Sequence, residues 1–117
     1  MNRCEFERLV TDTLNVVGDN PFSKYPSVTV FRHKGSKKWI CAVMTIRRRL
    51  LGLNDDSYVD IVNFKCGNEI IASMLDQNGI YPAYHMNKSS WVSVTLDGSC
   101  DDEDIKFLLG VSYELTK

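Results

Sequence analysis

The sequence predicts an α+β protein, a two-layer α/β sandwich in which helices cover an antiparallel five-stranded sheet. Apolar residues recur at helical spacing near both ends, and between them several short segments alternate in polarity. Short loops join consecutive strands, which favours antiparallel pairing. The expected order of elements is α-β-β-β-α-β-β-α, in a single domain over residues 1–117. A chain of this length buries a sufficient core without disulfides or metal ions.

The first helix is expected over residues 2–17, with Gly18 ending it. Its apolar face comprises Phe6, Leu9, Val10, Leu14 and Val17. From Val28 the polarity alternates with a period of two, which predicts a strand. Lys34–Lys38 contains a glycine and predicts a hairpin loop. The nearly continuous apolar run Trp39–Ile46 is typical of a central strand.

A loop is expected over Arg47–Ser57, followed by a third strand over Tyr58–Cys66. Asn68–Asn78 predicts the second helix, which Gly79 ends. The residues of this helix that are expected to point inward are Ile70, Ile71, Met74 and Leu75.

Ile80–Met86 is expected to be extended and to lie at a sheet edge, because Pro82 cannot donate a ladder hydrogen bond. Trp91–Leu96 predicts the last strand. Ser99 and Asp102 have the spacing of a capping box at the start of the last helix. The buried stripe of that helix is expected to be Ile105, Leu108, Leu109 and Tyr113.

The helices are expected to cover one face of the sheet and to leave the other face at least partly open. The residues expected on the open face include Asn63, Lys65, Trp91, Ser93 and Thr95. This assignment rests on polarity, and a shift of one residue in register would exchange the two faces.

Positive charge is concentrated in one part of the chain, although the formal net charge is only −1. Eight basic residues and no acidic ones occupy the segment from residue 24 to residue 49: Lys24, Arg32, Lys34, Lys37, Lys38, Arg47, Arg48 and Arg49. A concentrated positive surface attracts phosphates and other polyanions.

Charged residues interrupt the N-terminal segment, so it does not match a signal peptide, and no apolar run approaches the ~20 residues that cross a bilayer. We therefore expect a soluble cytoplasmic protein with no membrane partner. The cysteines are Cys4, Cys41, Cys66 and Cys100, with no CxxC pair. We expect all four to be reduced and structural, and we expect no metal ion or other cofactor.

Several motifs resemble those of the MmcQ/YjbR family. The most specific comprises Tyr84, His85, Met86, Asn87, Lys88 and Trp91. Others are Val30–His33, Lys38-Trp39, Asn63–Cys66, Leu96–Gly98 and Ser112–Leu115. The resemblance covers nearly the whole chain and implies a CyaY-like or secretion-chaperone-like fold. It also implies a candidate DNA-binding role through a double wing of β-hairpins.

One departure from the family pattern concerns Cys66-Gly67-Asn68-Glu69, where similar proteins have Cys-Asp-Pro-Glu. Loss of the Asp cap and of the following proline is expected to weaken the start of the second helix by about 1 kcal/mol.

The leading functional hypothesis is nucleic-acid binding by basic wings on the phosphate backbone. The expected phosphate contacts are Lys34, Lys37, Lys38, Arg47, Arg48 and Arg49, with Arg32, Lys65, Lys88 and Trp91 as secondary contacts. The two clusters flank one strand and are expected to lie roughly 25 Å apart. A solvated surface without a ligand explains the same charges, and the near-neutral total charge opposes tight non-specific binding.

The motif around His85 also has two interpretations. Its side chains could bind a phosphate or stack on a base. Alternatively, Asn87 satisfies the backbone of a turn, Lys88 lies over Trp91, and His85 bonds a buried carbonyl.

No catalytic or nucleotide-binding motif is present, and we expect no enzymatic activity. The alternative function is a protein-interaction module, as a monomer or weak dimer, with an apolar patch at Leu50, Leu51, Leu53 and Tyr81. An iron-related role at Asp101–Asp104 rests on fold analogy and ranks last.

Overall fold

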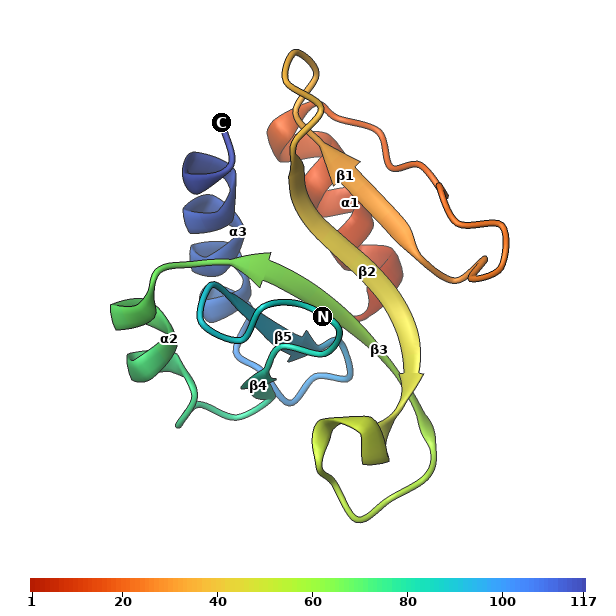
Figure 1. Ribbon diagram of the computed structural model, residues 1–117, viewed down its shortest axis with the longest axis vertical. Coiled ribbons are helices and arrows are strands. Elements are labelled where there is room, and N and C mark those ends of the chain that lie inside the picture. Colours follow the sequence, from red (N-terminus) through yellow and green to blue (C-terminus); the bar gives the residue numbers. More distant parts are fainter.

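The computed structural model describes residues 1–117 (Figure 1). Its helices are α1 (Arg3–Leu14), α2 (Asn68–Met74) and α3 (Asp102–Leu115), with a short 3₁₀ helix, η1 (Arg48–Leu51). Its strands are β1 (Thr29–Arg32), β2 (Trp39–Arg47), β3 (Tyr58–Lys65), β4 (Ile80–Pro82) and β5 (Trp91–Thr95). The predicted order of helices and strands is confirmed, and η1 is an addition within the predicted loop.

The strands form one antiparallel five-stranded sheet in the order β1-β2-β3-β5-β4, as predicted. The short strand β4 lies at one edge and ends at Pro82, which confirms the position inferred from that proline. At the other edge, Asp19 pairs with Val30 of β1 through an isolated antiparallel bridge. Neither edge therefore presents a long unpaired strand.

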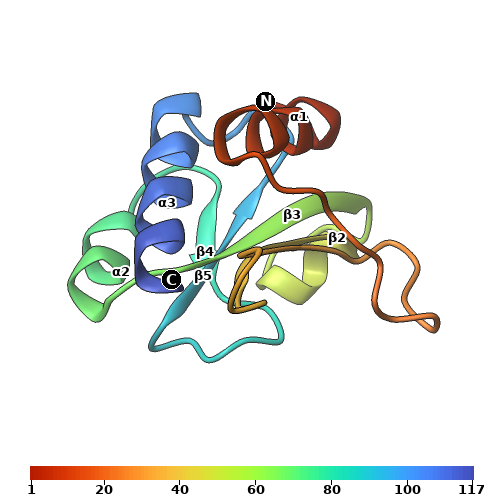
Figure 2. The same cartoon turned by 90° about the horizontal axis from the view of Figure 1, so that it is seen from above.

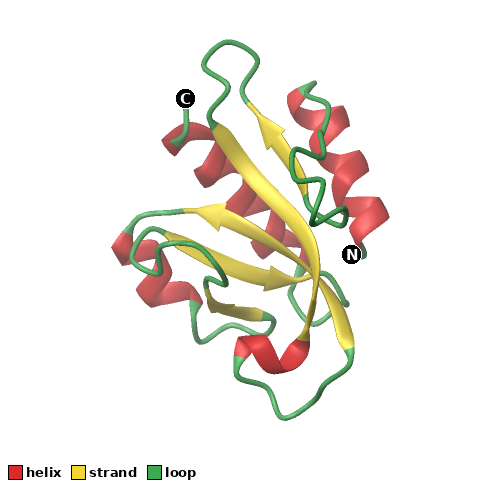
Figure 3. Cartoon of the chain, turned by 45° about the vertical axis from the view of Figure 1, so that its right-hand side comes forward, coloured by secondary structure: helices red, strands yellow, loops and turns green.

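Helices α1 and α3 lie beside each other on one side of the sheet, and η1 lies on the other side (Figure 2). The main core lies between these helices and the sheet, where Phe6 of α1 packs edge-on against Phe64 of β3 at 5.7 Å between ring centroids. From α3, Ile105, Leu108 and Leu109 are buried as predicted. Figure 3 shows how strongly the long strand β2 twists along its length.

The fourth position of the α3 stripe is occupied by Ser112 rather than Tyr113, which is only partly buried. The Ser112 hydroxyl donates to the carbonyl of Ile40 and accepts from the backbone N–H of Lys65 at 2.8 Å. Because these bonds satisfy the buried hydroxyl, a polar residue can join α3 to two strands within the core.

Helix α1 is shorter than predicted. It ends at Leu14 because Asn15 adopts a left-handed conformation with φ 55°, and Val17 is 83% exposed. The apolar pattern extends beyond this helix, but asparagine tolerates the left-handed region and therefore provides the end that Gly18 was expected to provide.

Two further helix boundaries differ from the predictions. Asp101, not Ser99, caps α3, accepting a hydrogen bond from the backbone N–H of Glu103 at 3.0 Å. Helix α2 ends at Met74, which leaves Leu75 partly exposed. Its N-cap is Gly67, which has no side chain to cap the helix, and the expected weakening of about 1 kcal/mol stays a prediction.

The prediction of an open sheet face is wrong for Asn63, Ser93 and Thr95, which are all buried. The chain at Tyr84 passes over two of them, since its N–H donates to Ser93 at 2.8 Å and its carbonyl accepts from Asn63 at 3.1 Å. The side chains on this face are polar because they form hydrogen bonds to the segment that covers them, and not because they are exposed to water. No helix of the chain is long and apolar enough to cross a membrane.

Candidate functional site

A groove of about 690 Å³ lies on the side of the sheet that faces away from the main core, because its lining residues Met44 and Asn63 alternate with the core residues Val43 and Val62. We call it the sheet groove. The loop 22–28, the end of β2 with η1, and the segment 84–86 supply most of its walls, while Met44 and Asn63 also line it. Three segments that are distant in sequence thus meet at one site.

Aromatic rings dominate this groove. They are Phe22, Tyr25, Trp39, Tyr58 and Tyr84. Tyr25 and Tyr58 are 66% and 64% exposed, and Phe22 packs edge-on against Trp39 with ring centroids 6.0 Å apart. Trp39, at the start of β2, lies partly exposed in the groove. Such rings offer flat apolar surfaces on which a planar ligand can stack.

The charged side chains that line the sheet groove are all basic, namely Lys24, Arg47 and Arg49, and the His85 imidazole also lines it. The Arg47 guanidinium lies over the ring of Tyr58, 4.6 Å from its centroid. Arg47 and Arg49 share the carboxylate of Asp56, at 3.1 Å and 2.8 Å. Because one carboxylate holds two guanidinium groups, the groove retains net positive charge and the arginines are kept in place.

Hydrogen bonds from two side chains of the sheet hold the segment that contains His85 in place. Tyr84 is bonded through both its backbone N–H and its carbonyl to the buried side chains of Ser93 and Asn63. His85 then adopts φ 58°, a left-handed conformation that is uncommon for residues other than glycine, and its ring centroid lies 4.1 Å from that of Tyr84. The buried pair therefore holds an unusual backbone conformation at the groove wall.

Arg48, the middle arginine of the predicted cluster, does not line the groove. It binds Asp97 at 2.9 Å and lies 3.8 Å from Asp55. Burial alone would raise the pKa of Asp97, but hydrogen bonds from Ser99 and Arg48 lower that pKa to about 2. Arg48 consequently joins the loop after β2 to the turn after β5.

The hairpin lysines Lys34, Lys37 and Lys38 are exposed and make no ion pair with a carboxylate side chain. They lie at the opposite end of β2 from η1, as predicted (Figure 1). The base of this hairpin contacts the end of α3, where His33 Nε2 lies 2.9 Å from the Thr116 hydroxyl.

The secondary contacts predicted from the sequence are dispersed. Arg32 binds Asp19 at 3.3 Å and lies over Trp39, 5.6 Å from its ring. Lys65 and Trp91 are opposite each other on β3 and β5, and neither lines the sheet groove.

The turn interpretation of the family motif is correct for Asn87, whose Oδ1 accepts from the Ser89 N–H at 2.9 Å. Lys88 makes no cation–π contact with Trp91. The His85 ring packs on Tyr84 rather than bonding a carbonyl.

All four cysteines are free, and Cys41, Cys66 and Cys100 are buried, whereas Cys4 is exposed and contributes no core packing.

No group of three or more histidine, cysteine and acidic side chains could hold a metal ion. In the acidic run, Asp101 caps α3 and Asp102 binds the N-terminal ammonium at 2.8 Å. The helix cap and the ion pair therefore give each of these two carboxylates a partner within the chain.

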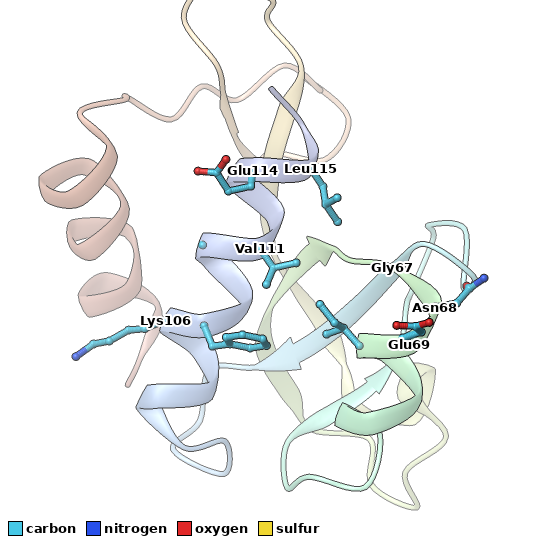
Figure 4. A pocket seen from close by; sticks show the side chains of 10 residues that line it. Gly67, Asn68, Glu69, Lys106, Val111, Glu114 and Leu115 are labelled. Atoms are coloured by element: carbon cyan, nitrogen blue, oxygen red, sulfur yellow. The ribbon is translucent and has the colours of Figure 1, made fainter.

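A second groove, of about 860 Å³, lies between α2 and α3 (Figure 4). We call it the helix groove. Ile70, Phe107, Val111 and Leu115 supply its apolar lining. Of the apolar patch expected at Leu50, Leu51, Leu53 and Tyr81, Leu50 lines the sheet groove and Leu51 packs against the small buried cluster of Ile46, Val59 and Ile61.

The fold and the sheet groove together define a small α+β domain with a basic, aromatic-lined groove on one sheet face. The family model YjbR matches residues 13–115, and the chain belongs to the YjbR family. The chain is 36% identical over its whole length to YyaQ of Bacillus subtilis, an uncharacterised protein of which the match covers 99%. It is 35% identical over 54 residues to the uncharacterised YjbR of Escherichia coli, covering 45% of this chain and 46% of the relative.

Solved structures agree with this assignment. A crystal structure of a Pseudomonas syringae protein, 37% identical, superposes with a TM-score of 0.96 over 100% of both chains. A Deinococcus radiodurans crystal structure, 26% identical, superposes with a TM-score of 0.72 over 98% of this chain and 78% of that one. The names of these proteins state no activity, so the functional argument depends on the groove itself.

Sequence reasoning missed Phe22, Lys24 and Tyr25 as groove residues. Two aromatic side chains between Pro21 and Pro26, in a segment without helical or strand periodicity, were the available signal. Large aromatic residues in a connecting loop have no place in a core pattern and need another explanation.

Proposed function

We propose that this protein binds single-stranded nucleic acid in the sheet groove, as a cytoplasmic binding protein without catalytic activity. The observation that supports the proposal is that exposed aromatic rings and basic side chains line one groove that has no carboxylate in its lining. Single strands are bound in this way by positively charged grooves with aromatic stacking platforms.

In the proposed mechanism, bases stack on Tyr25 and Tyr58, the most exposed rings of the groove. Each stacked base contributes about 1–3 kcal/mol. Phosphates contact Lys24, Arg47 and Arg49. Because guanidinium groups have five N–H donors, the two arginines can bind Asp56 and a phosphate at the same time.

This proposal modifies the double-wing hypothesis for duplex DNA. Arg48 binds Asp97, while Arg47 and Arg49 both bind Asp56. The three arginines are therefore less available to the phosphate backbone of a rigid DNA duplex than their sequence implied. The hairpin lysines make no ion pair with a carboxylate side chain, and Lys34 and Lys37 remain free to contact phosphates beyond the groove, whereas Lys38 Nζ lies 3.5 Å from the Lys117 oxygen. A flexible strand can follow both regions, whereas a duplex cannot enter the groove to stack its bases.

The test is fluorescence anisotropy of short labelled single strands and of the matching duplex, at low and near-physiological salt. We expect micromolar binding, tighter for the single strand. If about four phosphates are contacted, the logarithm of affinity should fall with a slope of about −3 against the logarithm of salt concentration.

Three variants separate the contributions. Tyr58→Ala should weaken binding about tenfold with little change in the salt slope, since stacking is not ionic. Arg49→Ala should reduce the slope by about 0.7. Arg8→Ala removes the same charge from an exposed position on α1, across the sheet, and serves as the matched control. Equal affinity for duplex and single strand, or equal effects of Arg8→Ala and Arg49→Ala, would contradict binding in the groove.

A further inference from the structure

Helix α3 exposes an apolar stripe along the helix groove. Phe107, Val111 and Leu115 are spaced four residues apart and line that groove. Phe107 is 50% exposed and Leu115 is 51% exposed, although both are large apolar side chains. Figure 4 shows Val111 and Leu115 on the side of α3 that faces α2. The stripe lies on the opposite side of the protein from the sheet groove and has no role in the proposed function.

Gly110 lies in the middle of this exposed surface. A glycine destabilises a helix interior relative to alanine, so it needs a compensating reason. The chain itself supplies none, since a Cβ added at Gly110 would meet no atom within 4 Å. A glycine at an exposed helix position is explained when the backbone of another molecule approaches it closely.

The charges on either side of Gly110 are complementary to each other. Lys106 precedes Gly110 by four residues, Glu114 follows it by four, and both line the helix groove. Two α3 helices that cross antiparallel at Gly110 would therefore place Lys106 of each copy beside Glu114 of the other. Within one chain, Lys106 pairs with the exposed Glu103 of the same helix at 3.7 Å, and Glu114 pairs with the exposed Lys117, just beyond the end of α3, at 3.1 Å. Such pairs are weak and can be exchanged.

We propose that the helix groove is occupied by α3 of a second copy of this chain, in a symmetric dimer with the two α3 helices antiparallel about Gly110. Each α3 then lies between α2 and α3 of the other copy, which covers Phe107 and Leu115. The contact is isologous, because the same surface serves both copies. A contact limited to these helices is at the small end of specific interfaces, so dissociation in the micromolar range is expected.

The experiment is sedimentation velocity of the full chain from low micromolar to several hundred micromolar. The unmodified chain should change reversibly from monomer to dimer over this range. Lys106→Glu and Glu114→Lys should each weaken self-association at least about tenfold, because each places like charges at both contacts. An equimolar mixture of these two variants should form a heterodimer, since it restores opposite charges at both contacts.

Two further variants keep the result interpretable. Gly110→Gln should raise the thermal unfolding temperature, because glutamine is the better helix former, while its side chain blocks the crossing and abolishes the dimer. Arg8→Glu reverses a charge on α1 and should leave the dimer unchanged. A chain that stays monomeric throughout, or a mixture of the two charge variants that does not associate, would overturn the proposal.

Discussion

Asn63 of β3 and Ser93 of β5 lie directly opposite each other in register, and the Ser93 hydroxyl donates to the Asn63 side-chain carbonyl. Both residues are completely buried. They also bind the two backbone polar groups of Tyr84, so the groove wall at residues 84–86 rests on a polar pair inside the sheet.

Asn63→Leu should lower the free energy of unfolding by about 2–4 kcal/mol, because away from water it leaves the Ser93 hydroxyl proton without an acceptor and the Tyr84 carbonyl without its donor. Urea denaturation measures the change. Asn87→Ala, which removes an exposed turn bond, is the comparison and should cost about 1 kcal/mol or less. Equal effects of the two substitutions would show that the buried pair contributes no special stability.

Alanine substitutions at two glycines with positive φ should distinguish the cost of backbone strain from the cost of steric overlap. Gly52 has φ 85° and open space around an added Cβ, so Gly52→Ala should cost only about 1–2 kcal/mol of strain. Gly79 has φ 78°, and its Cβ would lie 2.8 Å from the backbone nitrogen of Cys100. Gly79→Ala should therefore cost clearly more in urea denaturation, and an equal cost would mean that the turn at Cys100 shifts freely.

The lowered pKa of Asp97, about 2, makes stability depend on pH in the acid range. A carboxylate with a lowered pKa in the folded protein stabilises it fully above its unfolded pKa, near 3.8. This contribution disappears as the pH falls from about 4 to about 2. Solvent screening limits it to about 1 kcal/mol.

Asp97→Asn should remove this part of the pH dependence. The difference in unfolding free energy between the two proteins should be greatest at neutral pH and should shrink below pH 4. A difference that stays constant down to pH 2 would exclude Asp97 as the titrating group.

Thiol reactivity should distinguish Cys4 from the other cysteines. Burial raises the pKa values of Cys66 and Cys100 to about 11 and raises that of Cys41 further. Because thiolates react and buried thiols are inaccessible, a chromogenic disulfide reagent should modify one cysteine per folded chain rapidly. Cys4→Ser should abolish that fast reaction, and a second fast thiol would reveal local opening near Cys66 or Cys100.

Much of the fold followed from periodicity. The alternation in β3 correctly placed Val62 and Phe64 on the helix-covered face, and Pro82 correctly placed β4 at an edge. Periodicity failed at Val17, because a left-handed Asn15 ended the helix before the apolar pattern ended. Local capping geometry is decided by one or two residues and is not visible in the spacing of apolar side chains.

The candidate site was predicted less well than the fold. Charge counting found Arg47 and Arg49 but could not show that Arg48 turns toward Asp97, since that contact joins residues far apart in the chain. Polarity also misplaced Asn63 and Ser93, because a polar side chain that bonds a covering loop has the same sequence signature as one that faces water.

The bridge at Asp19–Val30 and the short, proline-ended β4 have a consequence for assembly. Sheets polymerise when an exposed edge strand accepts a strand from another molecule. Here one edge is already bonded near its middle and the other ends in a residue that cannot donate. Strand addition is thus blocked at both ends of the sheet, and growth into open-ended aggregates through backbone pairing is disfavoured. An ordered contact between copies that uses side chains instead, such as the proposed contact of two α3 helices, can adopt a two-fold arrangement that closes on itself and stops.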